Sequence, residues 1–236
     1  MSKSVETAEG YKNKVIIVTG ATRGIGYAIA KDLEKENIVI SIGRKKHKEK
    51  TPGIFIRCDI TNRKDVELTI QTIIKEFRKI DVLINCAGIM LYNDLIKATE
   101  EEFDRSFAVN VKGTFLMCRE VLPHMRKQKE GYIINISSVR GITAAPNKGI
   151  YSATKYAVRA LTETIFLENK GYNIKATSVC PGIIWTDSTK EKLKMEGLTK
   201  KDVLLEEDIV KTIKYLLSLS QKAHIREIVI GGRLHG

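Results

Sequence analysis

A tyrosine, a lysine and a serine near the middle of the chain have the types and spacing needed for proton transfer. Tyr151 and Lys155 stand four residues apart at the start of a predicted helix, so their side chains lie on one face. A free phenol has a pKa of about 10, and a neighbouring ammonium is expected to lower it by roughly one to three units. Ser138 ends a predicted strand thirteen residues upstream of Tyr151. Alone, the Tyr-x-x-x-Lys spacing also fits an ordinary half-exposed helix, so a catalytic role for the pair depends on other positions of the chain.

A glycine-rich turn near the N-terminus predicts an anion-binding site. The strand candidate Lys14–Thr19 runs directly into residues 20–26, which read GATRGIG, and then into a helical segment. Glycines at such a turn let the backbone approach a pyrophosphate, and the helix N-terminus offers it unpaired N–H groups. The position of the turn after the first strand favours a bound dinucleotide over a turn needed only for packing.

The end of the second predicted strand bears on which dinucleotide is bound. Proteins that prefer NAD usually place an acidic residue there to bind the ribose 2′-hydroxyl. Here residues 41–45 read SIGRK without a carboxylate, and Arg23 lies inside the glycine turn. A guanidinium can bind a 2′-phosphate through two hydrogen bonds. We therefore expect NADP(H) to be preferred, with NAD(H) as the alternative, and we expect Arg23 and Arg44 to be phosphate ligands.

Short apolar segments alternate with longer helical patterns along the chain. The strand candidates are nearly continuously hydrophobic, as is typical of parallel strands covered on both faces. This alternation predicts an α/β Rossmann fold, with one doubly wound seven-stranded parallel sheet, helices on both faces and a single domain over residues 1–236. Ligands of such sheets lie beyond the carboxyl ends of the strands. The predicted strands are Lys14–Thr19, Ile38–Ile42, Gly53–Cys58, Asp81–Asn85, Gly131–Ser137, Asn173–Cys180 and Glu227–Ile230. The predicted helices are Gly24–Glu36, Arg63–Arg78 with Thr61 or Asn62 as N-cap, Glu100–Val109, Val111–Gln128, Ile150–Asn169 and Glu206–Ser218.

Composition excludes several other classes. The four cysteines form no Cys-x-x-Cys pair and have no histidine at ligand spacing, so we expect buried reduced thiols and no metal site. The formal net charge of +12 is spread along the chain without a nucleic-acid motif. No apolar run reaches the roughly 18 residues of a membrane span, and the polar segment MSKSVETAEGYKNK lacks the apolar stretch of a secretory signal. We expect a cytoplasmic protein that binds neither nucleic acid nor membrane.

The motifs together resemble the short-chain dehydrogenase/reductase family from about Lys12 to Gly232. They are Thr-Gly-x-x-x-Gly-x-Gly, Asn-Cys-Ala-Gly at 85–88, Ile-Ser-Ser, Tyr-x-x-x-Lys and Pro-Gly-x-x-x-Thr, in that order. Cys86 departs from the family's Asn-Asn-Ala-Gly, and Ile230 departs from its frequent Asp-Gly-Gly. In this family the serine binds the substrate oxygen, the tyrosine exchanges the proton and the lysine holds the nicotinamide ribose. The resemblance implies the catalytic residues Asn110, Ser138, Tyr151 and Lys155, with Asn110 holding a water that links Lys155 to solvent.

The same resemblance assigns residues to the cofactor. The adenine is expected beside Asp59 and Ile60, the adenosine ribose beside Ala87 and Gly88, and the nicotinamide carboxamide beside Ile184 and Thr186. The complete expected set is Gly20, Thr22, Arg23, Gly24, Ile25, Gly26, Arg44, Asp59, Ile60, Asn85, Ala87, Gly88, Tyr151, Lys155, Pro181, Gly182, Ile184 and Thr186.

The resemblance implies hydride transfer between a nicotinamide and a small carbonyl or secondary-alcohol substrate, as in 3-oxoacyl carrier-protein reductases. A sugar or polyol dehydrogenase of the same family and a non-catalytic NADP(H)-sensing protein are alternatives. The family's substrate lid corresponds here to Asp187–Leu205, which is short and basic. Its lysines Lys190, Lys192 and Lys194 fit either an anionic substrate or carrier, or a solvated helix face. Relatives associate through the helices near Val111–Gln128 and Ile150–Asn169, so a homodimer or homotetramer is expected.

Overall fold

Seven parallel strands form the centre of the protein in the computed structural model, which describes residues 11–47 and 50–232. The strand order is β3-β2-β1-β4-β5-β6-β9, and every neighbouring pair in it is parallel. The order reverses direction between β1 and β4, so the carboxyl ends of these two strands flank a switch point. The predicted fold class is therefore confirmed. The strands are β1 (Val15–Thr19), β2 (Ile38–Gly43), β3 (Ile54–Arg57), β4 (Val82–Asn85), β5 (Gly131–Ile136), β6 (Ile174–Pro181) and β9 (Glu227–Ile230).

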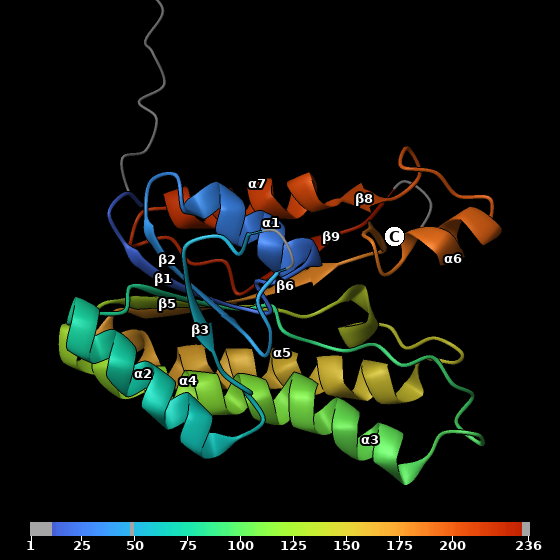
Figure 1. Cartoon of the computed structure of the whole chain (residues 1–236), viewed down its shortest axis with the longest axis horizontal. Coiled ribbons are helices and arrows are strands. Elements are labelled where there is room, and N and C mark those ends of the chain that lie inside the picture. Colours follow the sequence, from blue (N-terminus) through green and yellow to red (C-terminus); the bar gives the residue numbers. More distant parts are fainter. Residues whose placement is uncertain (1–10, 48–49, 233–236) are drawn as a thin grey trace, which may run out of the picture.

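Helices cover both faces of this sheet. Figure 1 shows α1 (Gly24–Leu33) and α7 (Glu206–Ser218) on one face, and α2 (Arg63–Phe77), α4 (Gly113–Gln128) and α5 (Gly149–Asn169) on the other. The first strand feeds both layers because successive side chains of a strand point to opposite faces. Val15 and Ile17 pack with the α2–α4–α5 layer, whereas Ile16 and Val18 pack with the α1–α7 layer.

Helix starts follow the capping chemistry of the sequence. Asn62 is the N-cap of α2, and its side chain accepts hydrogen bonds from the backbone N–H groups of Lys64 and Asp65. Thr99 closes a capping box with Glu102 at the start of α3 (Glu100–Phe107). Of the two N-cap candidates for the second predicted helix, Asn62 is therefore the right one.

Three features of the structure were not predicted. The chain between α3 and α4 forms a π-helical turn, Ala108–Lys112, where the sequence analysis expected two helices meeting at Asn110. The expected lid contains a short helix, α6 (Lys190–Met195). Beside it, β7 (Ile184–Trp185) and β8 (Leu204–Leu205) pair in parallel as a separate small sheet.

Searches of the described residues found neither a helix with the length and apolarity to cross a membrane nor a group of three or more potential metal ligands. Residues 1–10, which begin the polar N-terminal segment, lie outside the described residues. All four cysteines are free, and Cys58, Cys118 and Cys180 are buried, as expected, whereas Cys86 is only partly buried, against the expectation.

Candidate functional site

The carboxyl ends of four central strands bring distant segments of the chain together. Thr19 at the end of β1 lies beside Asn85 of β4, and Asn85 lies beside Asn135 of β5. Ile136 in turn lies beside Val179 of β6. The glycine turn, the Asn-Cys-Ala-Gly segment, Ser138 and the Pro-Gly segment follow these residues, so one edge of the sheet carries all four.

The glycine turn after β1 has no room for side chains where it passes the end of β4. Gly20 has a φ of +69°, and a Cβ atom there would lie 2.8 Å from the Ala87 Cα. A Cβ atom at Gly26 would lie 2.5 Å from the Gly20 carbonyl oxygen. Gly24 also has a positive φ, of +56°, and Arg23 precedes α1 without a side-chain cap hydrogen bond. The first N–H groups of α1 are therefore available to an anion at this turn.

Thr19 joins the two strand ends that border the glycine turn. Its Oγ1 accepts hydrogen bonds from the backbone N–H groups of both Cys86 and Ala87, each 3.1 Å long. Thr19 is fully buried. This link between the two strand ends was not predicted, because a threonine at the end of a strand is also explained by its high strand propensity alone.

The residues expected at the adenosine end lie around β2 and β3. The Thr22 side chain sits against Gly43, where a Cβ atom would lie 2.7 Å from the Thr22 Cγ2. Arg23 and Arg44 are exposed, from two different segments. Burial raises the pKa of Asp59, but hydrogen bonds from Thr61 and the charge of Arg44 outweigh it, so the pKa of that carboxyl is lowered.

Two of the expected cofactor residues turn their side chains into the protein. The Asn85 amide nitrogen donates to the Asn135 Oδ1 over 2.9 Å and to the Cys118 Sγ over 3.3 Å. Ile60 is buried and packs against Gly113. If Asn85 and Ile60 contact a cofactor at this edge, they do so through their backbone atoms.

Ser138, Tyr151 and Lys155 converge beyond the end of β5. The Ser138 hydroxyl lies close enough to the Tyr151 phenol to lower its pKa by hydrogen bonding. The Lys155 Nζ lies 5.7 Å from the centre of the Tyr151 ring. A Cβ atom at Gly88, in the segment after β4, would lie 3.7 Å from the Lys155 Nζ. Ser137 faces elsewhere, because its hydroxyl donates to the Lys155 carbonyl oxygen over 3.0 Å. The serine chosen from the sequence is thus the one beside the tyrosine.

The expected lowering of the Tyr151 pKa by Lys155 is wrong for this structure. Burial raises the pKa of the Tyr151 phenol to about 12, although the Ser138 hydroxyl acts in the opposite direction. Burial also lowers the pKa of Lys155 to about 8. The Lys155 ammonium donates to the Ile136 carbonyl oxygen over 2.8 Å instead of to the phenol oxygen. Desolvation, which disfavours the charged form of both groups, therefore decides the direction of both pKa shifts.

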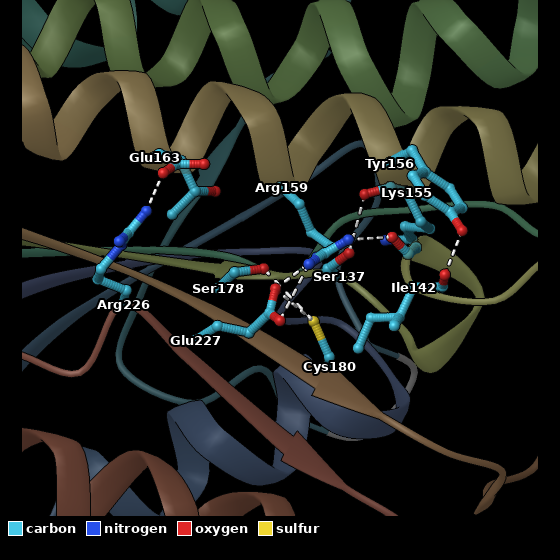
Figure 2. A network of polar contacts seen from close by, with 12 residues as sticks. Ser137, Ile142, Lys155, Tyr156, Arg159, Glu163, Ser178, Cys180, Arg226 and Glu227 are labelled. Atoms are coloured by element: carbon cyan, nitrogen blue, oxygen red, sulfur yellow. Dashed lines mark hydrogen bonds and ion pairs between the residues drawn. The ribbon is translucent and has the colours of Figure 1, made fainter. Parts of the chain in front are cut away.

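Helix α5 is held against the end of the sheet by polar contacts that fix Tyr151 and Lys155 in place. Figure 2 shows the Arg159 guanidinium, four residues after Lys155, in a two-pronged ion pair with Glu227 of β9. Arg159 also donates to the Gly141 carbonyl oxygen, and the Tyr156 hydroxyl donates to that of Ile142. These contacts tie both β9 and the segment after Ser138 to the same two turns of α5.

Asn110 points out of the π-helical turn toward the catalytic segment. Its Oδ1 accepts from the Ile89 N–H over 2.8 Å, and its Nδ2 donates to the Ile89 carbonyl oxygen over 2.9 Å. The same Nδ2 donates to the Thr154 Oγ1 over 3.0 Å, next to Lys155. Asn110 therefore links the segment after β4 to α5. Thr154 was not predicted, since a threonine inside a helix carries no signal for this contact.

The segment after β6 closes the remaining side of the site. Pro181 ends β6, and the Gly182 N–H donates to the Ile230 carbonyl oxygen over 2.7 Å, beside β9. The Thr186 hydroxyl contacts the hydroxyls of Ser188 and Thr189. The Thr189 Oγ1 also donates to the Ile184 carbonyl oxygen over 2.6 Å. Ile184 and Thr186 are thus held in a compact turn at the start of the lid.

Comparisons with known proteins agree with this geometry. A family model described as short chain dehydrogenase matches residues 14–197. An uncharacterized oxidoreductase of Staphylococcus saprophyticus is 33% identical over 235 residues, covering 93% of this chain and 96% of that protein. The 2-(R)-hydroxypropyl-CoM dehydrogenase of Xanthobacter autotrophicus is 37% identical over 196 residues, covering 77% and 78%. Among solved structures, the closed form of a serine dehydrogenase complexed with NADP+ matches with a TM-score of 0.86 and 27% identity, covering 94% of this chain and 96% of that one.

Proposed function

Because the chain belongs to the short-chain dehydrogenase family, and is therefore an oxidoreductase that uses NAD(P), we propose that it transfers a hydride between NADP(H) and a carbonyl or secondary-alcohol substrate. The observation that carries this proposal is the convergence of Ser138, Tyr151 and Lys155 beside Gly88 at one edge of the sheet. A phenol, a hydroxyl and an ammonium at one place meet the needs of acid–base chemistry at a carbonyl oxygen.

The residues at the switch point fit a dinucleotide. Side-chain-free positions at Gly20 and Gly26 and the uncapped start of α1 would receive the pyrophosphate. Arg23 and Arg44, both exposed, would bind the 2′-phosphate. The NADP+ in the serine dehydrogenase structure supports the same cofactor here. When bound, the reduced nicotinamide supplies the hydride and the oxidised ring accepts it.

The side chains of the site divide the proton chemistry between them. In carbonyl reduction, the Tyr151 hydroxyl gives its proton to the oxygen that gains charge, and the Ser138 hydroxyl donates a hydrogen bond to the same oxygen. Because the pKa of Tyr151 is raised to about 12, the phenol holds its proton at neutral pH and can donate it. Lys155, whose ammonium can release a proton, would return one to the resulting tyrosinate, and it would hold the nicotinamide ribose when the cofactor is bound. Asn110 keeps the Ile89 backbone and Thr154 in register with these groups.

For the substrate we propose only the chemical class, a carbonyl compound or secondary alcohol. A 3-oxoacyl carrier-protein substrate and a sugar or polyol both suit the chemistry, and the hydroxypropyl-CoM dehydrogenase and the serine dehydrogenase named above have different substrates. A non-catalytic NADP(H) sensor would also need the glycine turn. It would not need Ser138 and Tyr151 to meet, and that contact favours catalysis.

An NADPH-oxidation screen tests the proposal. The screen covers acetoacetyl thioesters, keto sugars, diketones and keto acids, and calorimetry compares the binding of NADPH with that of NADH. For the substrate found, Tyr151→Phe removes the proton donor and should lower kcat by about 10² to 10⁴, while NADPH binding stays within about twofold. Tyr215→Phe is the matched control, since Tyr215 is 52% exposed on α7, which covers the other face of the sheet. Substantial residual turnover in Tyr151→Phe would refute the assigned proton donor.

A further inference from the structure

Two lysine ammonium groups lie over one tyrosine ring beside the catalytic segment. The Lys192 Nζ is 3.8 Å from the centre of the Tyr92 ring, and the Lys148 Nζ is 5.3 Å from it. The three residues come from the segment after β4, the lid helix α6 and the residue preceding α5. Figure 1 shows α6 at the same end of the molecule as the start of α5.

This group borders the reacting side chains. Lys148 is the N-cap residue of α5, three residues before Tyr151. Tyr92 is close enough to Tyr151 for a charge on one phenol to raise the pKa of the other. Arg140 lies near the same group, because its charge acts to lower the pKa values of both Lys148 and Tyr92, and its guanidinium donates to the Thr143 carbonyl oxygen over 3.5 Å. Two ammonium groups therefore lie over a ring near Tyr151, and Arg140 follows Ser138 by two residues.

The local charge is strongly positive. Burial lowers the pKa of Lys148, and the charges of Arg140 and Lys192 lower it further, while Glu196 acts in the opposite direction. Glu196 also contacts Lys192, at 3.8 Å, but both side chains are about half exposed. Three cations thus face one loosely held carboxylate, and mutual repulsion of this kind is relieved when an anion binds.

Lys192 differs from the neighbouring lysines of α6 in what its ammonium group contacts. Lys190 pairs with Asp187 over 2.8 Å, and Lys194 pairs with Glu191 over 3.2 Å, one helical turn apart in each case. Lys192 lies between them and also has a partner on the helix, Glu196 at 3.8 Å, but its ammonium group lies over the Tyr92 ring as well. Lys190 and Lys194 therefore fit the solvated helix face, and Lys192 fits the binding of an anionic substrate.

We propose that the substrate carries a small anionic group, a carboxylate, sulfonate or phosphate, which Lys148, Lys192 and Arg140 bind above Tyr92. Its carbonyl or alcohol carbon then lies between Ser138, Tyr151 and the nicotinamide. This inference rests on the proposed function, since it names the substrate class of the same site. A small anion fits better than an acidic carrier protein, because the two ammonium groups converge on a single ring, a target of the size of one small group.

Matched substrate pairs test the inference. NADPH oxidation is measured with acetoacetate and methyl acetoacetate, with acetonylsulfonate and acetone, and with dihydroxyacetone phosphate and dihydroxyacetone. The wild type should prefer the anion of at least one pair by kcat/KM. Lys148→Met and Lys192→Met should each reduce that preference about tenfold. Lys194→Met, which removes an equivalent charge from the outer face of α6, should leave the preference unchanged.

Binding by calorimetry to the protein–NADPH complex covers the case in which none of these compounds is turned over. An anion of the set should bind, and Lys192→Met should weaken its affinity about tenfold. The inference is overturned if no anion binds, if neutral compounds are preferred, or if Lys194→Met has the same effect as Lys192→Met. It is also overturned if only an acyl group on an acidic carrier protein is reduced. If NADPH itself does not bind, the proposed function fails instead.

Discussion

Burial acts in opposite directions on the pKa values of the two titratable groups at the start of α5. It raises the pKa of Tyr151 to about 12 and lowers that of Lys155 to about 8, because it disfavours phenolate and ammonium alike. Near neutral pH the phenol is therefore protonated, and much of Lys155 is charged. That combination suits the donation of a proton to a reduced carbonyl. The oxidation direction needs phenolate, so it requires a further positive charge close to the ring.

A pH profile of carbonyl reduction tests this arrangement at the scale of one residue. Because the pKa of Lys155 is lowered to about 8, its positive charge is lost as the pH rises through that value. The kcat/KM for reduction should therefore fall above about pH 8, whereas Tyr151 keeps its proton over the same range. Lys155→Arg retains a cation at all accessible pH values and should move this decline out of the measured range, with a lower maximum rate. An unchanged decline in Lys155→Arg would assign it to another group.

At the scale of elements, regular segments were predictable and short irregular ones were not. All seven strands were predicted from their apolar, β-branched runs. Those of the inner strands are largely buried, as at Ile16 and Ile17 of β1, whereas the edge strands β3 and β9 are only partly buried. The lid helix α6 and the strands β7 and β8 span six, two and two residues, too few to produce a period. The Tyr92–Lys192 contact joins segments far apart in the chain, and no spacing in the sequence signals it.

The catalytic segments could be located from motifs, but their side-chain environments could not. The thirteen-residue spacing to Tyr151 was enough to choose Ser138 rather than its neighbour Ser137. The inward turn of Asn85 depends on Asn135 and Cys118, which come from other elements. The raised pKa of Tyr151 depends on burial by the whole fold. The sequence shows only that the charge of Lys155 is near, and that charge alone predicts a lowered pKa of Tyr151, which is the wrong direction.

The π-helical turn is an element with a measurable consequence. Asn110→Ala would leave the Ile89 N–H and carbonyl oxygen, which now share one side chain, without these partners. Loss of buried hydrogen bonds of this kind should lower the free energy of unfolding by about 1 to 3 kcal/mol, as measured by urea denaturation, and should also reduce turnover. Lys112→Ala, at an exposed position of the same turn, should change stability by less than about 0.5 kcal/mol. Equal effects of the two substitutions would show that Asn110 does not hold Ile89 in place.

At the scale of the whole molecule, the outer layer of α3, α4 and α5 leaves large apolar side chains uncovered. Phe103, Phe115 and Leu167 are 45%, 44% and 51% exposed on these three helices. Exposed aromatic and aliphatic residues on adjoining helices are typical of surfaces that bind another protein. The net charge of +12 opposes association of identical copies through repulsion, which salt weakens. Apolar contact and charge therefore act against each other in self-association.

We expect the protein to form a homodimer or homotetramer through α4 and α5, and to associate more tightly as salt is raised. Sedimentation velocity at low and moderate ionic strength measures this. Phe115→Glu would bury a carboxylate in the expected contact and should shift the protein to monomers, since an unpaired buried charge is strongly unfavourable. Leu68→Glu is the matched control, because Leu68 is 62% exposed on α2 and lies outside the expected contact. A wild-type monomer at all salt concentrations, or equal dissociation by both substitutions, would refute association through α4 and α5.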